Sequence, residues 1–304
     1  MKPKSFLRAG LAVLLVMLLL QGCGFRGRVR LDRESQEFYE TARLIMTGEE
    51  KDIFRLLPDK ASREEFIEDF WAKRDPDPDT EVNEFREEFF RRIEYANKHF
   101  LEGIPGWKTD RGRIYIYLGP PDKIERRPYI NDPNVKGLIW WGYYRYRLGL
   151  EFIDRTGDGR YTLNRQAGAP GGLLEVIEQA KFGQVFQDQG DFGAMFKKFR
   201  AGYDARTREL FVSIPVEALS FSTGGGKLRV EFRFAFFIYQ KKGSWRDRFQ
   251  RDRVFEASEE EILGLERIVL SFPYELERGE YFVDVIVTVK PKVGKFRKIF
   301  RVKV

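Results

Sequence analysis

The sequence predicts an α+β protein: an N-terminal helical module with a small antiparallel sheet, followed by a C-terminal all-β, immunoglobulin-like sandwich. Apolar residues recur every three or four positions between residues 34 and 100, which is typical of helices that bury one face. Beyond residue 106 the apolar period changes to two, and alternating runs recur after residue 209. Hydrophobic residues make up 42% of the chain, enough to build a large core in one or two domains.

Three or four helices are expected between residues 34 and 100. Ser62 and Glu65 have the spacing of a capping box and predict the start of one helix, which Pro76 and Pro78 would end. Thr80 is the expected cap of the next helix. The apolar positions form three groups: Phe38, Ala42 and Ile45; Phe66, Ile67, Phe70 and Trp71; and Val82, Phe85, Phe89, Ile93, Ala96 and Phe100.

The first β-structure is expected directly after the helices. Ile114, Ile116 and Leu118 alternate with polar or aromatic residues and predict a strand that ends at Gly119. Further strands are expected at 138–144, 148–153 and 161–163, the last two joined by a hairpin turn at 157–159. Together these strands predict a small antiparallel sheet packed on the helices.

The last hundred residues show the pattern of a β-sandwich. Residues 167–172 form a break, and the weakly helical stretch 173–200 is expected to be a connector. Leu276–Val283 is similar to the tyrosine-corner string of immunoglobulin-like folds, in which a Tyr hydroxyl ties the start of a strand to a loop. Six alternating runs predict strands at 210–214, 228–239, 246–255, 268–272, 281–289 and 296–304.

The N-terminus has the features of an export signal. Lys2, Lys4 and Arg8 precede an apolar run at 9–20, which is too short to span a bilayer. Gln21, Gly22 and Cys23 follow this run, and the string Leu20-Gln21-Gly22-Cys23 resembles the bacterial lipobox. That resemblance implies cleavage before Cys23, diacylation of its thiol and acylation of the new amine. An ordinary secretory signal with an incidental Cys is the alternative.

This interpretation predicts an exported protein held in the cell envelope by lipids on Cys23, so that the membrane is its first partner. Gly24 after the cysteine favours the outer membrane over the inner one. Cys23 is the only cysteine, so a lipidated chain can form no disulfide. The expected segments are a signal peptide at 1–22, a tether at 23–33, a helical plus β domain at 34–166, a connector at 167–204 and a sandwich at 205–304.

Several motifs are similar to those of a known family. They are Asp69-Phe70-Trp71-Ala72-Lys73-Arg74-Asp75-Pro76, Asn83-Glu84-Phe85, Tyr95-Ala96-Asn97 and Gly106-Trp107-Lys108-Thr109-Asp110-Arg111-Gly112. The chain resembles the GWxTD-domain proteins over roughly residues 34–165. The resemblance implies a bacterial envelope protein whose helical and β module often precedes an immunoglobulin-like part, and it implies no reaction.

The segment 106–112 supports two interpretations. In the structural one, Gly106 permits an unusual turn, Trp107 anchors the loop, and Thr109 or Asp110 bonds loop amides. In the functional one, an aromatic ring, a carboxylate and a guanidinium hold a sugar or a peptide end. That ligand site would consist of Trp107, Thr109, Asp110, Arg74 and Asp75.

The most basic part of the chain lies between residues 241 and 253. Its cationic residues are Lys241, Lys242, Arg246, Arg248, Arg251 and Arg253. Because export separates the chain from nucleic acid, we expect no nucleic-acid partner. An anionic lipid, lipopolysaccharide or wall polymer is one interpretation of this segment, and a solvated strand face, partly neutralised by Asp247 and Asp252, is the other.

Sites for metals and cofactors are not predicted. The single His excludes an HExxH zinc site, and no GxSxG, GxGxxG or GxxxxGK[ST] string occurs. Asp154, Thr156 and Asp158 superficially resemble a calcium loop, but their spacing departs from the EF-hand pattern and favours a hairpin turn.

Two functions are therefore considered. The first is a non-enzymatic envelope lipoprotein whose C-terminal sandwich binds another envelope protein or an anionic wall polymer. The second is an enzyme that acts on envelope glycan or peptide through carboxylates near Trp107. The absence of recognised nucleophile and metal motifs favours the first.

Overall fold

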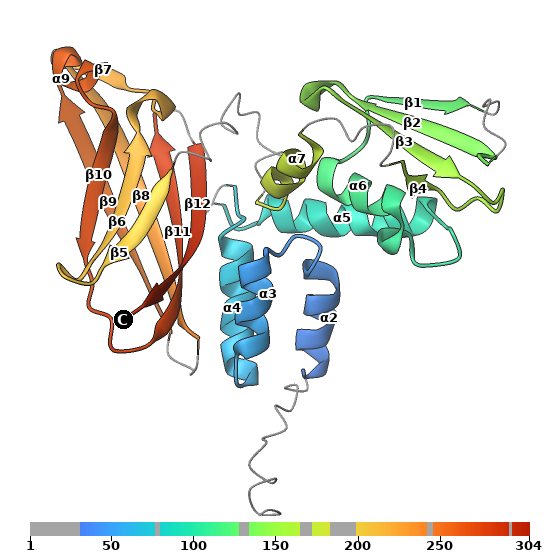
Figure 1. Cartoon of the computed structure of the whole chain (residues 1–304), viewed down its shortest axis with the longest axis horizontal. Helices are drawn as coiled ribbons and strands as arrows, with labels where there is room; N and C mark the ends of the chain where they lie inside the picture. The colour runs from blue at the N-terminus through green and yellow to red at the C-terminus, as the bar shows by residue number, and fades with distance from the viewer. Residues whose placement is uncertain are drawn as a thin grey trace, which may run out of the picture.

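The helices lie between a small N-terminal sheet and a pair of C-terminal sheets, as Figure 1 shows. The structure is a computed structural model that describes residues 31–76, 80–127, 134–164, 172–182, 199–241, 246–291 and 294–304. Helices fill the N-terminal part, and antiparallel sheets fill most of the C-terminal half. The predicted mixture of α and β structure in this order is confirmed.

Four helices occupy the described part of 34–100, as predicted. The helical elements are α2 (Arg33–Ala42), α3 (Gly48–Leu56), α4 (Lys60–Ala72), α5 (Glu84–His99), η1 (Gly106–Lys108), α6 (Asp110–Leu118), η2 (Tyr144–Tyr146), α7 (Leu173–Ala180), η4 (Val216–Ala218) and α9 (Glu259–Leu263).

Two predicted helix starts are wrong. The cap of α4 is Asp59, whose carboxylate accepts a hydrogen bond from the Ser62 amide at 2.7 Å. The cap of α5 is Asn83, whose side chain accepts from the Arg86 amide at 2.8 Å. Asp and Asn are about as favourable as Ser at the cap position and more favourable than Thr, so these two residues cap α4 and α5.

The predicted strand at 113–118 is the helix α6. Thr109 caps its start, and Gly119, with a φ of 80°, ends it. The alternating apolar pattern predicted a strand wrongly because other parts of the molecule cover α6 on several sides. Ile114, Ile116 and Leu118 are buried, while the rings between them find partners elsewhere: Tyr115 stacks on Tyr95 of α5 with ring centroids 4.3 Å apart, and the Tyr117 hydroxyl donates to the Leu44 carbonyl at 3.0 Å.

Every predicted strand other than this one is present, and three short strands were not predicted. The strands are β1 (Lys123–Arg127), β2 (Gly137–Tyr143), β3 (Leu148–Asp154), β4 (Thr162–Leu163), β5 (Arg200–Asp204), β6 (Glu209–Pro215), β7 (Ser222–Gly224), β8 (Lys227–Gln240), β9 (Arg246–Ala257), β10 (Arg267–Pro273), β11 (Glu280–Lys290) and β12 (Gly294–Lys303). The unpredicted ones are β1, β5 and β7.

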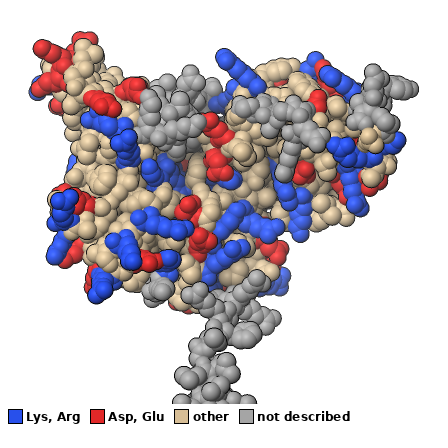
Figure 2. All heavy atoms as spheres, in the orientation of Figure 1, with Lys and Arg blue, Asp and Glu red and all other residues tan. Residues whose placement is uncertain are grey.

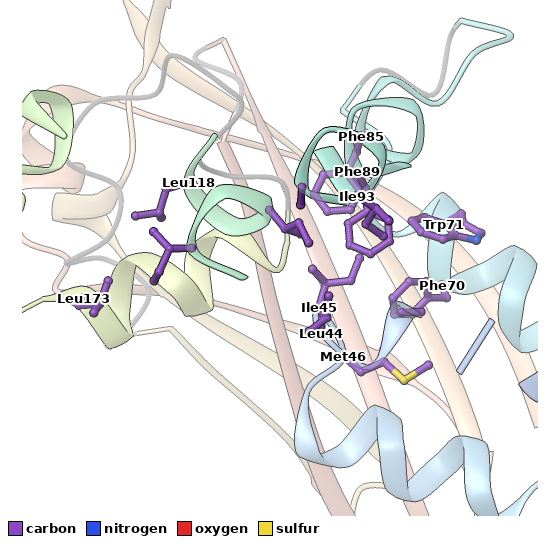
Figure 3. Packing of buried hydrophobic residues seen from close by; sticks show 14 of the residues in the cluster. Leu44, Ile45, Met46, Phe70, Trp71, Phe85, Phe89, Ile93, Leu118 and Leu173 are labelled. Carbon is purple, nitrogen blue, oxygen red and sulfur yellow. The ribbon is translucent and has the colours of Figure 1, made fainter. Parts of the chain in front are cut away.

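The small sheet has the order β1-β2-β3-β4 and is antiparallel throughout. One face, which includes Trp141 of β2 and Phe152 of β3, packs into the same core as the helices. Figure 3 shows how this core draws together residues from α4, α5, α6 and α7, among them Phe70, Phe89 and Leu173. The helical module and the small sheet therefore share one hydrophobic core.

The C-terminal half contains two antiparallel sheets around a second core. One sheet has the order β10-β6-β5, and the other has the order β12-β11-β8-β7, with β9 also paired to β8. Phe residues of β8 and Val residues of β11 fill the space between the sheets. The Tyr281 hydroxyl donates to the Glu277 carbonyl at 3.1 Å, which is the bond that the tyrosine-corner string predicts.

The opposite face of the larger sheet packs on the helical module. Because side chains alternate along a strand, β11 directs Val283 into the second core and Phe282 and Asp284 toward the helices. Tyr239 of β8 and Phe282 belong to the core of the helical module. The two halves of the chain thus meet across a buried face of β11, β8 and β12.

Candidate functional site

The segment 106–112, called here the glycine segment, is a tight junction between α5 and α6. A Cβ atom on Gly106 would lie 1.9 Å from the Ala96 carbonyl oxygen, and one on Gly112 would lie 1.9 Å from the Gly106 carbonyl oxygen. Neither position has room for a side chain. The two glycines therefore allow backbone to pack directly on backbone where α5, η1 and α6 meet.

The polar residues of the glycine segment bond to neighbouring backbone. The Thr109 hydroxyl donates to the Gly106 carbonyl at 2.8 Å and accepts from the Gly112 amide at 3.0 Å. Asp110 accepts from the Leu163 amide at 3.0 Å and so holds β4. The Trp107 amide donates to the Asn97 side chain at 3.2 Å, and the Trp107 ring packs against the core of the helical module.

Arg74 and Asp75, the other proposed ligand residues, lie at the far end of α5. The Asn83 side chain at the start of α5 donates to the Trp71 carbonyl in α4, whereas Gly106 touches Ala96 in the last turn of α5. The 16 residues of α5 make a rod about 24 Å long. The structure therefore brings Trp107, Thr109 and Asp110 together and keeps Arg74 and Asp75 apart from them.

Arg74 instead belongs to a buried set of charges between the two halves, called here the interface cluster. Its six charged members are Glu50, Asp69, Lys73, Arg74, Asp284 and Arg297, each at most 8% exposed. Three are acidic and three are basic, so their formal charges cancel. They come from α3, α4 and the following turn, and from β11 and β12.

Two carboxylates organise the interface cluster. Glu50 accepts from both terminal nitrogens of Arg74, at 3.0 and 2.7 Å, and from Arg297 Nη2 at 2.8 Å. Asp284 accepts from Arg297 Nε at 2.7 Å and pairs with Lys73 Nζ at 2.9 Å. Arg297 thereby joins a carboxylate of the first helices to one of the C-terminal sheet.

The cluster continues through Tyr239 to the surface. Lys73 Nζ donates to the Tyr239 hydroxyl at 2.9 Å, and that hydroxyl donates to Asp69 at 3.2 Å. Asp69 then pairs with Arg248 of β9 at 2.9 Å. Asp69, Lys73 and Arg74 belong to the motif 69–76. Asp69 and Lys73 bind strands of the C-terminal sheet directly, and Arg74 is connected to it through Glu50.

Burial disfavours the ionised form of the carboxylates in the interface cluster, and the neighbouring cations favour it. Burial alone would raise the pKa of the Glu50 carboxyl, but Arg297 and Arg74 outweigh it and hold that pKa well below its usual value. Burial also opposes ionisation of Asp284, and Arg297 and Lys73 reverse its effect, so the pKa of Asp284 is lowered. Both carboxylates are therefore ionised at neutral pH.

The cationic residues between 241 and 253, called here the basic segment, make different kinds of contact. Lys241 pairs with Glu280 at 2.6 Å, Arg246 pairs with Glu65 of α4, and Arg248 pairs with Asp69. Lys242 lies outside the described residues. Arg251 and Arg253 lie over the Phe249 and Phe272 rings, 5.1 and 5.3 Å from their centroids. Figure 2 shows basic and acidic side chains interspersed on the face that it presents.

Asp154 organises the turn between β3 and β4. Its carboxylate accepts from the Gly157 amide at 2.7 Å and from the Gly159 amide at 2.8 Å, and both glycines have a positive φ. Thr156 and Asp158 bond to each other at 2.7 Å. The oxygens considered for calcium thus serve the predicted hairpin turn, and the described residues contain no group of three or more His, Cys, Asp or Glu side chains that could hold a metal ion.

Sequence reasoning missed Glu50, Asp284 and Arg297, the non-local half of the interface cluster. One signal was available: Asp284 is a single charge inside the apolar run 281–289, and an unpaired charge in a buried strand is costly. Such a residue predicts a buried cation as partner. The identity of that cation depends on contacts such as Glu50–Arg297, which joins residues 247 positions apart.

Comparison with known protein families agrees with the motifs. The model of the GWxTD domain matches residues 31–167. These residues form a GWxTD domain. The match covers α2 to β4, so the GWxTD domain comprises the helical module with the small sheet, and the predicted resemblance is confirmed there. A search of curated proteins found no match to the chain.

The N-terminal calls lie outside the described residues. Residues 1–22, Cys23 and the tether up to residue 30 therefore stay predictions from the sequence. Within the part of the chain that the structure describes, no helix is both long and apolar enough to cross a bilayer.

Proposed function

We propose that the chain is an exported lipoprotein of the cell envelope, anchored through Cys23 in the outer membrane rather than the inner one, and that it binds another envelope protein. The single observation that carries the proposal is the run from Lys2 to Cys23, with its basic start, short apolar stretch and lipobox-like end. Two or more acyl chains hold a protein stably on a membrane.

The interface cluster suits such a role. Two domains in one chain move relative to each other unless their interface is large or strongly constrained. Here buried charged pairs join α3 and the turn after α4 to β12 and β11: Glu50 pairs with Arg297, and Lys73 pairs with Asp284. A C-terminal part held in one orientation would present a binding surface at a defined position relative to the anchored GWxTD domain.

The C-terminal part is proposed to be an immunoglobulin-like sandwich that serves as the binding module. Two antiparallel sheets around one core and the bond from Tyr281 to Glu277 support this assignment. An enzyme that uses carboxylates near Trp107 is less well supported, because Asp110 holds β4 and Glu102 accepts from Arg111 and from the Tyr161 amide.

The anchor is tested by expressing the full chain and its Cys23→Ala variant with labelled palmitate. We expect the variant to lose the label and to keep its signal peptide, seen as a larger mass, because the lipobox resemblance implies cleavage before a lipidated Cys23. Labelling that survives the substitution would contradict lipidation at Cys23.

The binding role is tested with a photo-crosslinking amino acid placed at exposed positions of the anchored full chain, followed by mass spectrometry of the products. We expect one defined envelope protein, linked from the C-terminal sheets and not from Phe90 of α5, which is 43% exposed. An anionic wall polymer would instead give binding that salt abolishes. Wall fragments whose masses change with the wild type but not with Asp110→Asn would support the enzyme.

A further inference from the structure

The two C-terminal sheets have edge strands that are paired on one side, β9 and β10 among them. Among the described residues, β9 pairs with β8 alone and β10 pairs with β6 alone. An edge strand offers unpaired N–H and C=O groups that can accept a further strand. The side chains around the two edges differ, and that difference tells which edge is open.

Side chains of the strand itself occupy the free edge of β9. The Arg248 amide donates to the Asp247 side chain at 2.8 Å, and the carbonyls of Gln250 and Asp252 accept from Arg251 at 2.8 Å and from Arg253 at 3.0 Å. These three backbone groups belong to even-numbered residues, so they share one side of the strand. Two arginines of the basic segment thus occupy backbone carbonyls of β9 that a further strand would need.

Among the described residues, no side chain bonds to the outward backbone groups of β10. Arg253 of β9 lies over the Phe272 ring, and Asp247 and Phe249 contact Tyr274 just past the end of the strand. The Glu266 carbonyl accepts from the Val216 amide, and the Tyr274 amide donates to the Arg208 carbonyl, so the even-numbered residues between them direct their backbone groups toward β6. Val269 and Ser271 consequently direct theirs to the open side. The Val269 side chain is 60% exposed, which leaves an apolar residue on this edge.

An apolar groove opens where β10 begins. It has a volume of about 660 Å³, and its lining includes Val216, Ile262, Leu263 and Leu265. Leu263 is 81% exposed and Leu265 is 39% exposed. A strand that extended along β10 would pass the groove and could bury a side chain in it.

The groove is lined by charges of both signs, and the acidic excess lies at α9. Glu217 and Glu266 line the groove together with Arg200 and Arg267. The first turn of α9 adds Glu259, Glu260 and Glu261, all exposed. Figure 2 shows acidic side chains gathered at the tip of the molecule where α9 lies. Opposite charge attracts and orients a partner more than it adds affinity.

We infer that the partner docks by adding an extended segment to the open edge of β10, with an apolar side chain in the α9 groove and basic residues beside the acidic first turn of α9. Backbone bonds to Val269 and Ser271 supply the ladder, and the groove selects the side chain. The edge of β9, whose outward backbone groups already bond to its own side chains, does not bind the partner. This inference rests on the proposed binding role, but not on the lipid anchor.

Proline substitutions on the two edges provide a matched test. Val269→Pro removes an outward N–H from β10, and Val254→Pro makes the same change at an exposed outward position of β9, where Val254 is 51% exposed. In the full chain carrying the photo-crosslinking amino acid at Leu263, we expect Val269→Pro to lower the yield of the crosslinked partner about tenfold and Val254→Pro to leave it unchanged. Equal yields from the two variants, or loss with Val254→Pro alone, would overturn the inference.

A second measurement distinguishes loss of binding from misfolding of the proline variants. With the crosslinker at Ser271, Leu265→Ser should lower the yield several-fold, whereas Leu101→Ser on the exposed surface of the GWxTD domain should not. Hydrogen exchange at Val269 and Ser271 should slow in the purified complex. Crosslinks from Val254 alone would keep the proposed binding role and reject the β10 edge, whereas crosslinks from Phe90 alone would reject both. No specific product from any position would reject both, and a product that is only a second copy of the chain would reject a foreign partner.

Discussion

The glycine segment and the interface cluster both fix helices in place, but they do so by opposite physical means. In the glycine segment, backbone packs on backbone because Gly106 and Gly112 have no side chains. In the interface cluster, long side chains with full charges reach across a buried surface. The glycine segment depends on two residues that have no Cβ atom. The interface cluster depends on an opposite charge beside each buried charge.

The difference teaches where each kind of contact belongs. Close backbone contact is local, since the glycine segment joins two helices that are neighbours in the sequence. Charged pairs act between distant segments, and a buried pair specifies a geometry even where it adds little net stability. A chain that must hold two folded halves in one orientation gains from the second kind of contact.

The largest effect is expected from Arg297→Met. The substitution leaves Glu50 with one cation fewer and Asp284 with Lys73 alone, so buried negative charge is no longer balanced. We expect the free energy of unfolding to fall by about 3 to 5 kcal/mol in a denaturant titration. Glu37→Gln, which breaks the exposed pair Arg33–Glu37, should cost less than about 1 kcal/mol.

A second variant separates the cost of unpaired charge from the value of the cluster. Replacing Glu50 and Arg74 together by Gln and Met removes one charge of each sign and should cost less than Arg297→Met. If the double variant is the more destabilised, unpaired charge is not what makes the cluster sensitive.

Gly106→Ala should have the next largest effect. Its Cβ atom would meet the Ala96 carbonyl, which lies in the backbone of α5 and cannot move alone. We expect a loss of about 3 kcal/mol, at the upper end for an overpacked site. Gly48→Ala is the matched control because nothing lies within 4 Å of its Cβ position, and its melting temperature should stay the same or rise. Equal effects of the two changes would remove the special role of the glycine segment.

The contrast also explains how much could be predicted from the sequence. Amphipathic spacing between residues 34 and 100 is local, and it predicted the helices. The alternating runs after residue 209 predicted β6 and β8 to β12 in the same way. Alternation failed at 113–118 because α6 is packed on several sides, so its apolar pattern no longer reports one buried face.

The candidate sites were harder to predict than the fold. Trp107, Thr109 and Asp110 lie together because they are neighbours in the sequence. Arg74 was assigned to them on chemical type, whereas its partner Glu50 is set by the packing of α3 on α4. Arg251 and Arg253 were grouped as an anionic-partner patch, and only the register of β9 on β8 shows that they lie along a free edge.

Thr109→Val should have a smaller effect than Gly106→Ala. The change keeps the shape of the side chain but removes its bonds to the Gly106 carbonyl and the Gly112 amide. Loss of a helix cap costs about 1 kcal/mol. Thermal melting should show this loss for Thr109→Val and none for Thr223→Val on the exposed strand β7. A neutral Thr109→Val would mean that the glycines alone hold the junction.

The smallest effect is expected at Lys295, and it depends on pH. Lys295 Nζ donates to the Asp75 carbonyl at 2.7 Å beside the interface cluster, and burial lowers the pKa of this lysine to about 8 from 10.5. Between pH 8 and 10.5 the unfolded chain binds more protons at this group than the folded one, so the group makes stability rise with pH.

Lys295→Met removes that contribution. The free energy of unfolding of the variant minus that of the wild type should therefore fall, by on the order of 1 kcal/mol, as the pH rises from 8 to 10. Lys298→Met is the control, because Lys298 lies on the other face of β12 and bonds to the Phe199 carbonyl. Denaturant titrations at several pH values measure both differences. A difference that is constant for Lys295→Met would show that the protein solvates this ammonium well, and that the interface tolerates an extra cation without cost.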